Sequence, residues 1–469
     1  MIKRLIRFFT PEGMLGRGDR VGELESTRSV YKHFIILAWP AMAESLMTAL
    51  TGFVDTAMVG SLGDSAIAAV GLTNQPRLLF WSFFTTLNLG VLAVVARKKG
   101  EGDREAANDC LHQCLNICAA MAVVIYAVAY IFAEPLMIFA GAGPDVLSDS
   151  VDYYRIIMLG LCLYSFALCI NAAQRGTSNT KIAFQTSATL NIVNVVLNYL
   201  LIGGNLGFPA LGVKGAAYAT LCGNIAGLAV AIVSLFKRNG YLRFDIRRCF
   251  GFQKKTMSMV WQVSSGAAVE QLLVRIGFFT FAKIVAGLGT DSFAAHQIGM
   301  NIVSLSFACG DGLGVAASAL VGQNLGKKRP DMAIIYGKAG QRVGFLFSAV
   351  LFIMFTAFPY QIIGIFTDTP HVTSMLVGIM FFISLTSITQ ISQVIFSGCL
   401  RGAGDTKYMA KVSFLSIALL RPCLCYLLCF PCGLDVVGAW IALFIDQSLR
   451  CIFSSVRFIG GKWTKIELG

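Results

Sequence analysis

Four polar side chains recur at helical spacing inside an apolar stretch in the first eighth of the chain. They are Glu44, Thr48, Thr51 and Asp55. Intervals of four, three and four residues place all of them on one face of a helix, along about 16 Å of its axis. A carboxylate on such a face can ionise, take up a cation and release it. We therefore expect cation exchange centred on Asp55, and we predict no catalytic residues.

A second polar stripe runs through residues 183–202. Ser187, Asn191, Asn194 and Asn198 again share one helical face. Their amides could hydrogen-bond a carboxylate or offer oxygen ligands. We predict a coupling-ion site that consists of Asp55, Thr51, Asn191, Asn194 and Asn198. The alternative is that the Asn and Thr side chains only join helices, a role worth about 1 kcal/mol per hydrogen bond.

Other polar residues inside apolar stretches are candidates for contact with a substrate or a cavity. They are Glu44, Glu270, Asp311, Gln390 and Arg421. Glu44 and Glu270 either have one structural role repeated in both halves or line a shared cavity. Arg421 precedes Pro422, which kinks a helix, and we expect it to pair with a carboxylate across the cavity. Asp446 and Arg450 are four residues apart and predict a mutual salt bridge, while His296 is expected to be a hydrogen-bonded structural residue.

The elements that carry these residues are predicted from composition. The chain is 56% apolar and 13% charged, whereas soluble domains are about 25% charged. Several charge-free runs approach or exceed the roughly 20 residues that a helix needs to cross a bilayer, and they lack the alternation of barrel strands. The predicted spans are 35–60, 74–96, 110–133, 152–173, 183–202, 215–236, 257–286, 297–321, 343–366, 372–398, 410–431 and 436–456.

The distribution of basic residues predicts the orientation of these spans. With the N-terminus inside, 31 of the 38 Lys and Arg residues fall in cytoplasmic segments, one falls outside and six lie in spans. We expect a multi-pass protein of the cell membrane with both termini cytoplasmic. The net charge of +13 then reflects topology and contact with membrane lipid, so no nucleic-acid partner is expected. We expect a monomer.

The two halves of the chain repeat each other at an offset of 226 residues. Glu44 matches Glu270, Arg175 matches Arg401 and Thr180 matches Thr406. Six spans per half give both halves the same orientation, a transporter architecture. We therefore predict an all-α integral membrane protein with twelve transmembrane helices in two parallel six-helix lobes, related by a pseudo-two-fold axis along the membrane normal. The predicted parts are a cytoplasmic tail (1–33), an N-lobe (34–236), a cytoplasmic interlobe loop (237–255), a C-lobe (256–457) and a cytoplasmic C-terminal tail (458–469).

The same offset serves as an internal control on the polar stripes. It turns Thr48, Thr51 and Asp55 into Val274, Gly277 and Phe281. It turns Asn191, Asn194 and Asn198 into Ile417, Leu420 and Leu424. We therefore expect a polar interior in the N-lobe and a mostly dry interior in the C-lobe.

Taken in order, these residues resemble the multidrug and toxic compound extrusion (MATE) family. The matching pieces are Pro40 with Glu44, then 52–60 (GFVDTAMVG), 294–298 (AAHQI), 320–326 (LVGQNLG) and 401–407 (RGAGDTK). The resemblance implies a V-shaped, two-lobed antiporter that exports small organic, often cationic, compounds in exchange for Na⁺ or H⁺. Asp55 resembles the N-lobe acid of the DinF-like and NorM-like branches. Asn198 stands where the DinF-like branch usually has Asp, and Val274 and Gln390 stand where the NorM-like branch has acids.

Two other function classes compete with an exporter of organic compounds. The first is a flippase or exporter of lipid-linked or polar metabolites from the same superfamily, whose cavity would be strongly cationic; Arg275, Lys283 and Arg421 are few and scattered. The second is a membrane enzyme, but the sequence has no metalloprotease motif and no P-loop. Most cysteines lie in apolar runs and read as small hydrophobic residues. We expect no enzyme activity, no metal site and no cofactor besides the coupling cation, H⁺ or Na⁺.

Overall fold

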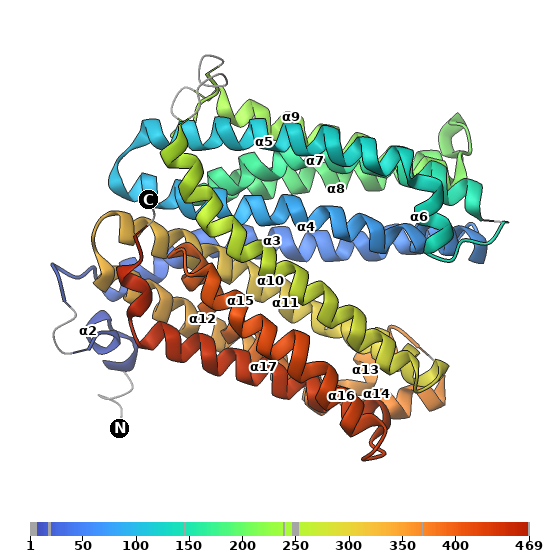
Figure 1. The fold of residues 1–469 in the computed structure, drawn as a ribbon. Coiled ribbons are helices and arrows are strands. Elements are labelled where there is room, and N and C mark those ends of the chain that lie inside the picture. The colour runs from blue at the N-terminus through green and yellow to red at the C-terminus, as the bar shows by residue number, and fades with distance from the viewer. Residues whose placement is uncertain are drawn as a thin grey trace. The chain divides into compact units, whose positions relative to one another are not determined.

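The computed structural model describes residues 7–16, 20–144, 146–237, 240–245, 253–367 and 369–467. Long helices make up nearly all of this part of the chain, and none of the described residues is in a strand (Figure 1). Helices satisfy their own backbone hydrogen bonds, which is what a lipid environment demands of a spanning segment.

Six long helices form the first half. They are α3 (Thr27–Gly60), α4 (Asp64–Glu101), α5 (Arg104–Ile131), α7 (Leu147–Gly176), α8 (Thr180–Ile202) and α9 (Gly212–Leu235). The short helix α6 (Ala133–Phe139) joins α5 to α7, and the one-turn helix α2 (Pro11–Met14) precedes α3.

The second half repeats the pattern with one irregular helix. Its long helices are α10 (Lys254–Ala286), α11 (Thr290–Gly326), α12 (Pro330–Ala357), α14 (Pro370–Gly402) and α17 (Asp435–Ile459). A sixth, composite helix consists of α15 (Thr406–Ser413), the π-helical segment η3 (Phe414–Leu420) and α16 (Arg421–Cys429). The remaining short pieces are η1 (Asn205–Gly207), α13 (Pro359–Ile363) and η4 (Lys462–Lys465).

The twelve predicted spans all fall on helices. Ten helical segments among the described residues are long and apolar enough to cross a membrane, and the other two predicted spans correspond to α8, with 23 residues, and α10, with 33. The predicted span 343–366 is wrong at its end, because α12 stops at Ala357 and a separate helix begins at Pro359. Proline disfavours helical geometry in the residue before it, here Phe358.

Contact patterns divide the chain into two compact units. One consists of residues 43–260, and the other consists of residues 1–42 together with 261–468. The division therefore falls inside α3, whereas the lobe boundary at residue 34 stays a prediction. Within the first unit α8 packs on α9 and α4 packs on α7; within the second, α14 packs on both α11 and α17.

Small residues allow the closest helix contact of the second unit. A Cβ atom added to Gly398 would lie 2.3 Å from the Gly314 carbonyl oxygen, and one added to Gly402 would lie 2.3 Å from that of Ser318. Glycines four residues apart on α14 thus let its backbone touch that of α11, as small residues do between membrane helices.

In each unit, side chains of one helix bind the backbone of a connecting or terminal segment. On α5, Asn108 Oδ1 accepts from the Arg243 amide at 2.7 Å, and His112 Nε2 accepts from the Asp245 amide at 3.0 Å. On α12, Lys338 Nζ donates to the Met14 carbonyl at 2.6 Å, and Asp331 accepts from the Val21 amide at 3.2 Å.

These docked segments belong to the predicted interlobe loop and the predicted N-terminal tail. His112 and Lys338 occupy matching positions at the offset of 226 residues, so the third long helix of each half holds the segment that precedes the other half. In the first unit, burial raises the pKa of Tyr241, whose ring lies 5.8 Å from the Arg104 guanidinium. Residues 238–239 and 246–252 of the predicted loop lie outside the described residues.

Candidate functional site

A chain of side-chain hydrogen bonds connects Asp55 on α3 to α8 and α9. Asn198 Nδ2 donates to Asp55 Oδ1 at 2.6 Å and to Asn194 Oδ1 at 3.3 Å. Asn194 Nδ2 donates to Thr220 Oγ1 at 3.1 Å, and the Thr220 hydroxyl donates to the Ala216 carbonyl at 3.0 Å. Each member fixes the orientation of the next, so this polar chain holds one carboxylate oxygen with neutral groups alone.

The polar chain has oxygen atoms to offer a cation. Asn198 Oδ1 is buried and has no hydrogen-bond partner within the described part of the chain. Asp55 itself is half-buried, and the charge of Arg77 on α4 acts on it. A carboxylate beside an amide oxygen is the ligand chemistry that hard cations prefer, and the carboxylate alone can take up a proton.

The predicted coupling-ion residues are only partly brought together. Asp55, Asn194 and Asn198 are joined as predicted. Thr51 is half-buried on the same face of α3, and Asn191 is buried on α8, but neither makes a hydrogen bond to Asp55 among the described residues. Sequence reasoning missed Thr220, since α9 shows no repeated polar spacing that would single it out.

Glu44 lies on the same helix as Asp55 but has other partners. Arg175 Nη2 at the end of α7 lies 2.5 Å from Glu44 Oε1, and Ser187 Oγ donates to the same oxygen at 2.9 Å. Glu44 is buried, so this ion pair joins α3, α7 and α8 in the first unit.

The second unit repeats this ion pair. Arg401 Nη2 at the end of α14 lies 2.5 Å from Glu270 Oε1 on α10, and Arg401 Nε lies 3.3 Å from Glu270 Oε2. The two Glu–Arg pairs occupy matching positions of the sequence repeat, which favours the structural interpretation of Glu44 and Glu270 over a cavity lining. The sequence held the signal, because the Arg residues match at the same offset as the Glu residues. The predicted spans end at residues 173 and 398, which leaves both arginines outside them, whereas α7 and α14 continue to Gly176 and Gly402.

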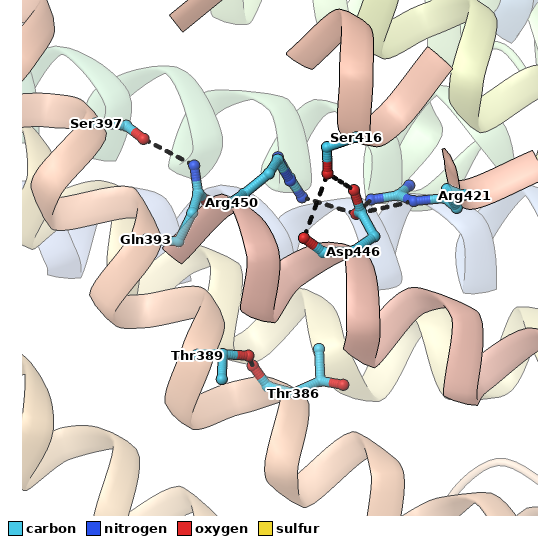
Figure 2. A network of polar contacts seen from close by, with 8 residues as sticks. All are labelled: Thr386, Thr389, Gln393, Ser397, Ser416, Arg421, Asp446 and Arg450. Carbon is cyan, nitrogen blue, oxygen red and sulfur yellow. Dashed lines mark hydrogen bonds and ion pairs between the residues drawn. The ribbon is translucent and has the colours of Figure 1, made fainter. Parts of the chain in front are cut away.

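A buried charge cluster links α16 to α17 in the second unit (Figure 2). Arg421 Nε donates to Asp446 Oδ2 at 3.0 Å, and Arg421 Nη2 bonds the same oxygen. Ser416 on η3 donates to Asp446 Oδ1, and Arg450 Nη2 lies 3.4 Å from Oδ2. The side chains of Arg421 and Asp446 are 0% exposed. Figure 2 shows the two arginines on opposite sides of the Asp446 carboxylate.

This arrangement corrects the expectations for Arg421. It lines no open surface in this structure, and its carboxylate partner is on the neighbouring helix, not across a cavity. The predicted Asp446–Arg450 pair is present, but Arg421 makes the shorter contact. The Arg421 guanidinium also lies 4.7 Å from the centre of the Phe278 ring on α10, a cation–π contact that helps to hold a buried charge.

The π-helical segment changes which residues of the two halves correspond. A Cβ atom on Gly215 would meet the Leu201 carbonyl, and one on Gly438 would meet that of Leu428. The two leucines therefore correspond, 227 positions apart, although Thr180 and Thr406 correspond at 226. A π-helical turn accommodates one residue more than an α-helical turn, and η3 supplies it just before Pro422, which cannot donate a backbone hydrogen bond.

With the extra residue counted, Asn194 corresponds to Arg421 and Asn198 to Cys425. The expectation of a dry C-lobe at this position, which compared Asn194 with Leu420, is therefore wrong. On the facing helices α9 and α17, Gly215 corresponds to Gly438, an offset of 223 residues. The same offset matches Gly223 to Asp446. Gly223 lies against Asn194, since its added Cβ would be 3.2 Å from Asn194 Cβ. The same helix contact thus carries an amide beside glycine in one half and an ion pair in the other.

The remaining predicted residues make no hydrogen bond to the polar chain of Asp55 or to the Arg421–Asp446 cluster in the described part of the chain, although the Arg421 charge acts on His296. Gln390 on α14 is fully buried and accepts from the Ser306 hydroxyl at 3.1 Å. Asp311 on α11 is exposed, and its charge acts on Arg401. His296 packs against Phe281 and Trp440, with ring centres 5.1 and 5.9 Å away. Its Nδ1 has no hydrogen-bond partner in the described residues, so His296 is a packed residue but lacks the hydrogen bond expected at this atom.

Comparison with known proteins identifies the relatives of the chain. The family model MatE matches residues 40–200 and, a second time, residues 267–427. The chain is 28% identical to "Probable multidrug resistance protein NorM" of Thermotoga maritima over 454 residues, covering 94% of this chain and 95% of that protein. It is 26% identical to "Multidrug resistance protein MdtK" of Edwardsiella ictaluri, covering 91% and 94%.

Solved structures share the fold. The structure titled "Outward-facing conformation of a multidrug resistance MATE family transporter of the MOP superfamily" superposes with a TM-score of 0.86 at 20% identity, covering 92% of this chain and 97% of that one. A MOP superfamily transporter from Pyrococcus furiosus, whose title reports a binding pocket of reversed polarity, gives 0.85 at 20% identity, again covering 92% and 97%. The fold class predicted from the sequence is confirmed.

Proposed function

Because the chain belongs to the MatE family of membrane transporters, we propose that it is a secondary active antiporter with its coupling site at Asp55. It exports small organic compounds, lipophilic cations above all, in exchange for H⁺ or Na⁺ by alternating access. We also propose that it works as a monomer in the cell membrane with both termini in the cytoplasm. The observation that carries the proposal is the polar chain of Asp55, Asn198, Asn194 and Thr220.

The polar chain suits exchange because it neutralises no charge. Asn198 donates a hydrogen bond to Asp55 but carries no positive charge, and an ionised carboxylate at membrane depth is expensive unless a cation accompanies it. H⁺ or Na⁺ can satisfy Asp55 in one state, and a cationic substrate can replace it in another. The charge of Arg77 stabilises the carboxylate between these events and favours release of the cation.

The proposed substrate contacts are fewer than the sequence suggested. Glu44 and Glu270 each hold an arginine of their own unit, and Arg421 holds Asp446, so none of the three is proposed as a substrate ligand. Asp311 is exposed and is the carboxylate of the second unit that we propose to attract a cationic substrate. Gln390 is fully buried in this structure and bonds Ser306 of the same unit.

The test is transport by purified protein in liposomes. A fluorescent lipophilic cation is followed under an imposed Na⁺ gradient and, separately, under an imposed pH gradient. We expect one gradient to drive the parent protein and Asp55→Asn to lose that response. The matched control is Asp152→Asn, which removes a carboxylate that pairs with Lys214 on the exposed outer end of the helices and should transport normally. Gradient-driven transport by Asp55→Asn at the parent rate would remove Asp55 from the mechanism.

The second candidate, a flippase for lipid-linked or polar metabolites, finds less support. Such a substrate carries phosphate groups and needs accessible cationic side chains. Of the three arginines and lysines considered for that role, Arg421 is fully buried against Asp446. The same liposomes distinguish the candidates, since a flippase would not move the fluorescent cation in response to either gradient.

A further inference from the structure

The Asp446 carboxylate is a buried anion, and side chains of the protein bond both of its oxygens. Two nitrogens of Arg421 bond Oδ2, and the Ser416 hydroxyl bonds Oδ1. Arg450 adds a second positive charge 3.4 Å from Oδ2. The cluster therefore carries one negative and two positive charges, and solvent reaches neither Asp446 nor Arg421.

The corresponding helix contact in the first unit has the opposite character. There Asn194, the counterpart of Arg421, accepts a hydrogen bond from Asn198, which in turn donates to Asp55, so Asp55 is supported by uncharged amides. Gly223, the counterpart of Asp446, leaves space for the Asn194 side chain. One unit presents a carboxylate with neutral partners, and the other presents a carboxylate with a guanidinium bound to it.

We propose that Arg421 is a tethered cation that permanently occupies the Asp446 carboxylate, so that this cluster is a closed cation site and Arg421 limits exchangeable cation binding to the first unit. This inference rests on the proposed function of Asp55 for its meaning in transport, but the cluster itself can be tested without it. In the parent protein a mobile cation would have to displace a guanidinium held by two hydrogen bonds and would meet the charge of Arg450.

Removal of Arg421 should therefore open the site. Met has a similar length and no charge, so Arg421→Met leaves Asp446 with Ser416 and the more distant Arg450. A small cation then gains a buried carboxylate oxygen as ligand, and the free guanidinium ion can replace the lost side chain. A role of Arg421 in packing alone would not create any dependence on cations.

The experiment measures thermal unfolding of purified protein in detergent at constant pH and constant chloride. Either NaCl or guanidinium chloride replaces N-methylglucamine chloride, from about 1 to about 100 mM. The background is Asp55→Asn, so that the first unit contributes no cation effect. We expect no cation-dependent shift for Asp55→Asn alone, and a rise in Tm of about 5 °C for Asp55→Asn with Arg421→Met, since a ligand that binds only the folded state stabilises it. Addition of Asp446→Asn should abolish that rise.

Each result decides one claim. A cation-dependent Tm in Asp55→Asn alone would show an exchangeable site that Arg421 does not close, and would overturn the inference even if the Arg421 variants fail to fold. A double variant with no response to either cation would also overturn it. The proposed role of Asp55 is decided separately by the liposome assay, because a site for H⁺ would give no response to either cation at constant pH. The comparison of Arg421→Met with Arg421→Met plus Asp446→Asn still tests the closed site.

Discussion

The two halves of the chain place polar groups at the same helix contact and give them different charge. In the first half, α8 meets α9 through Asn194, Gly223 and Thr220, and the chain of amides ends on Asp55 of α3. In the second half, the corresponding helices meet through Arg421 and Asp446. Neutral amides leave a carboxylate able to exchange a partner, whereas a guanidinium fixes it.

The two halves agree where they use the same Glu–Arg pair. Glu44 with Arg175 and Glu270 with Arg401 occupy matching positions and have matching distances of 2.5 Å. The two halves share the ion pair that joins their first and fourth long helices, α3 with α7 and α10 with α14. They differ at the contact between their fifth and sixth helices. The difference between the halves therefore separates the contacts that the scaffold requires from those that the proposed cation exchange requires.

The largest loss of stability is expected at the Asp446 cluster of the second half. Asp446→Asn leaves Arg421 and Arg450 buried without the carboxylate that they share, and removal of one partner of a buried ion pair destabilises by about 3–5 kcal/mol. Unfolding of the purified protein by heat or denaturant measures the loss. Arg421→Met in the same chain should recover much of it, because the remaining charge is then a single arginine. A double variant that is no more stable than Asp446→Asn would show that the two side chains do not act as a pair.

The matched Glu–Arg pairs should differ in a smaller but ordered way. Glu44→Gln leaves Arg175 beside Ser187, while Glu270→Gln leaves Arg401 still within reach of the Asp311 charge. Both arginines are partly exposed, so we expect losses below the buried-pair range, about 2–3 kcal/mol for Glu44→Gln and about 1–2 kcal/mol for Glu270→Gln. Unfolding measurements on the two variants give the order. Adding Asp311→Asn to Glu270→Gln should raise its loss of stability to that of Glu44→Gln. A loss for Glu270→Gln alone that exceeds the loss for Glu44→Gln would contradict this account.

Apolar stretches were sufficient to predict the fold, and helical periodicity was sufficient to predict part of the Asp55 site. Twelve apolar stretches predicted twelve helices, and the spacing of Asp55, Asn194 and Asn198 predicted faces that do meet. Periodicity describes one helix at a time, so it could not choose which residues of a third helix would join, and Thr220 was missed. It also could not show that Thr51 and Asn191, on the correct faces, lie outside the hydrogen-bonded chain.

The error in the second half has a single physical origin. A comparison at constant offset assumes that both copies have the same helical pitch, and η3 adds one residue between Ser413 and Arg421. One extra residue turns the following part of a helix by about 100°. The constant offset therefore compared Asn194 with Leu420 instead of Arg421, and a charged contact was predicted to be apolar. Pro422 was the available signal, since a proline inside a predicted span marks the place where a helix is irregular.

Among the neutral groups, the far end of the polar chain should matter less than Asp55. Thr220→Val keeps the shape of the side chain but removes the acceptor for Asn194 Nδ2. The lost hydrogen bond is worth about 1 kcal/mol, which corresponds to roughly a fivefold weaker response of transport to the driving cation. The half-saturating cation concentration in the liposome assay measures it. The control is Thr280→Val on α10, whose hydroxyl bonds only its own helix at the Ile276 carbonyl, and equal effects of the two variants would deny the polar chain a role in coupling.

The smallest effect is expected where the two halves hold the segments that dock on α5 and α12. His112 Nε2 accepts a backbone hydrogen bond and Lys338 Nζ donates one, each inside its own unit. His112→Ala leaves the half-buried Asp245 amide without its acceptor, and Lys338→Met leaves the Met14 carbonyl without its donor, at about 1 kcal/mol each. Limited proteolysis should therefore cut faster within 240–245 in the first variant and near Met14 in the second, with transport nearly unchanged. Because the segments dock on separate units, the two effects should add within about 0.5 kcal/mol when combined. A double variant much less stable than that sum would mean that the two docked segments depend on each other.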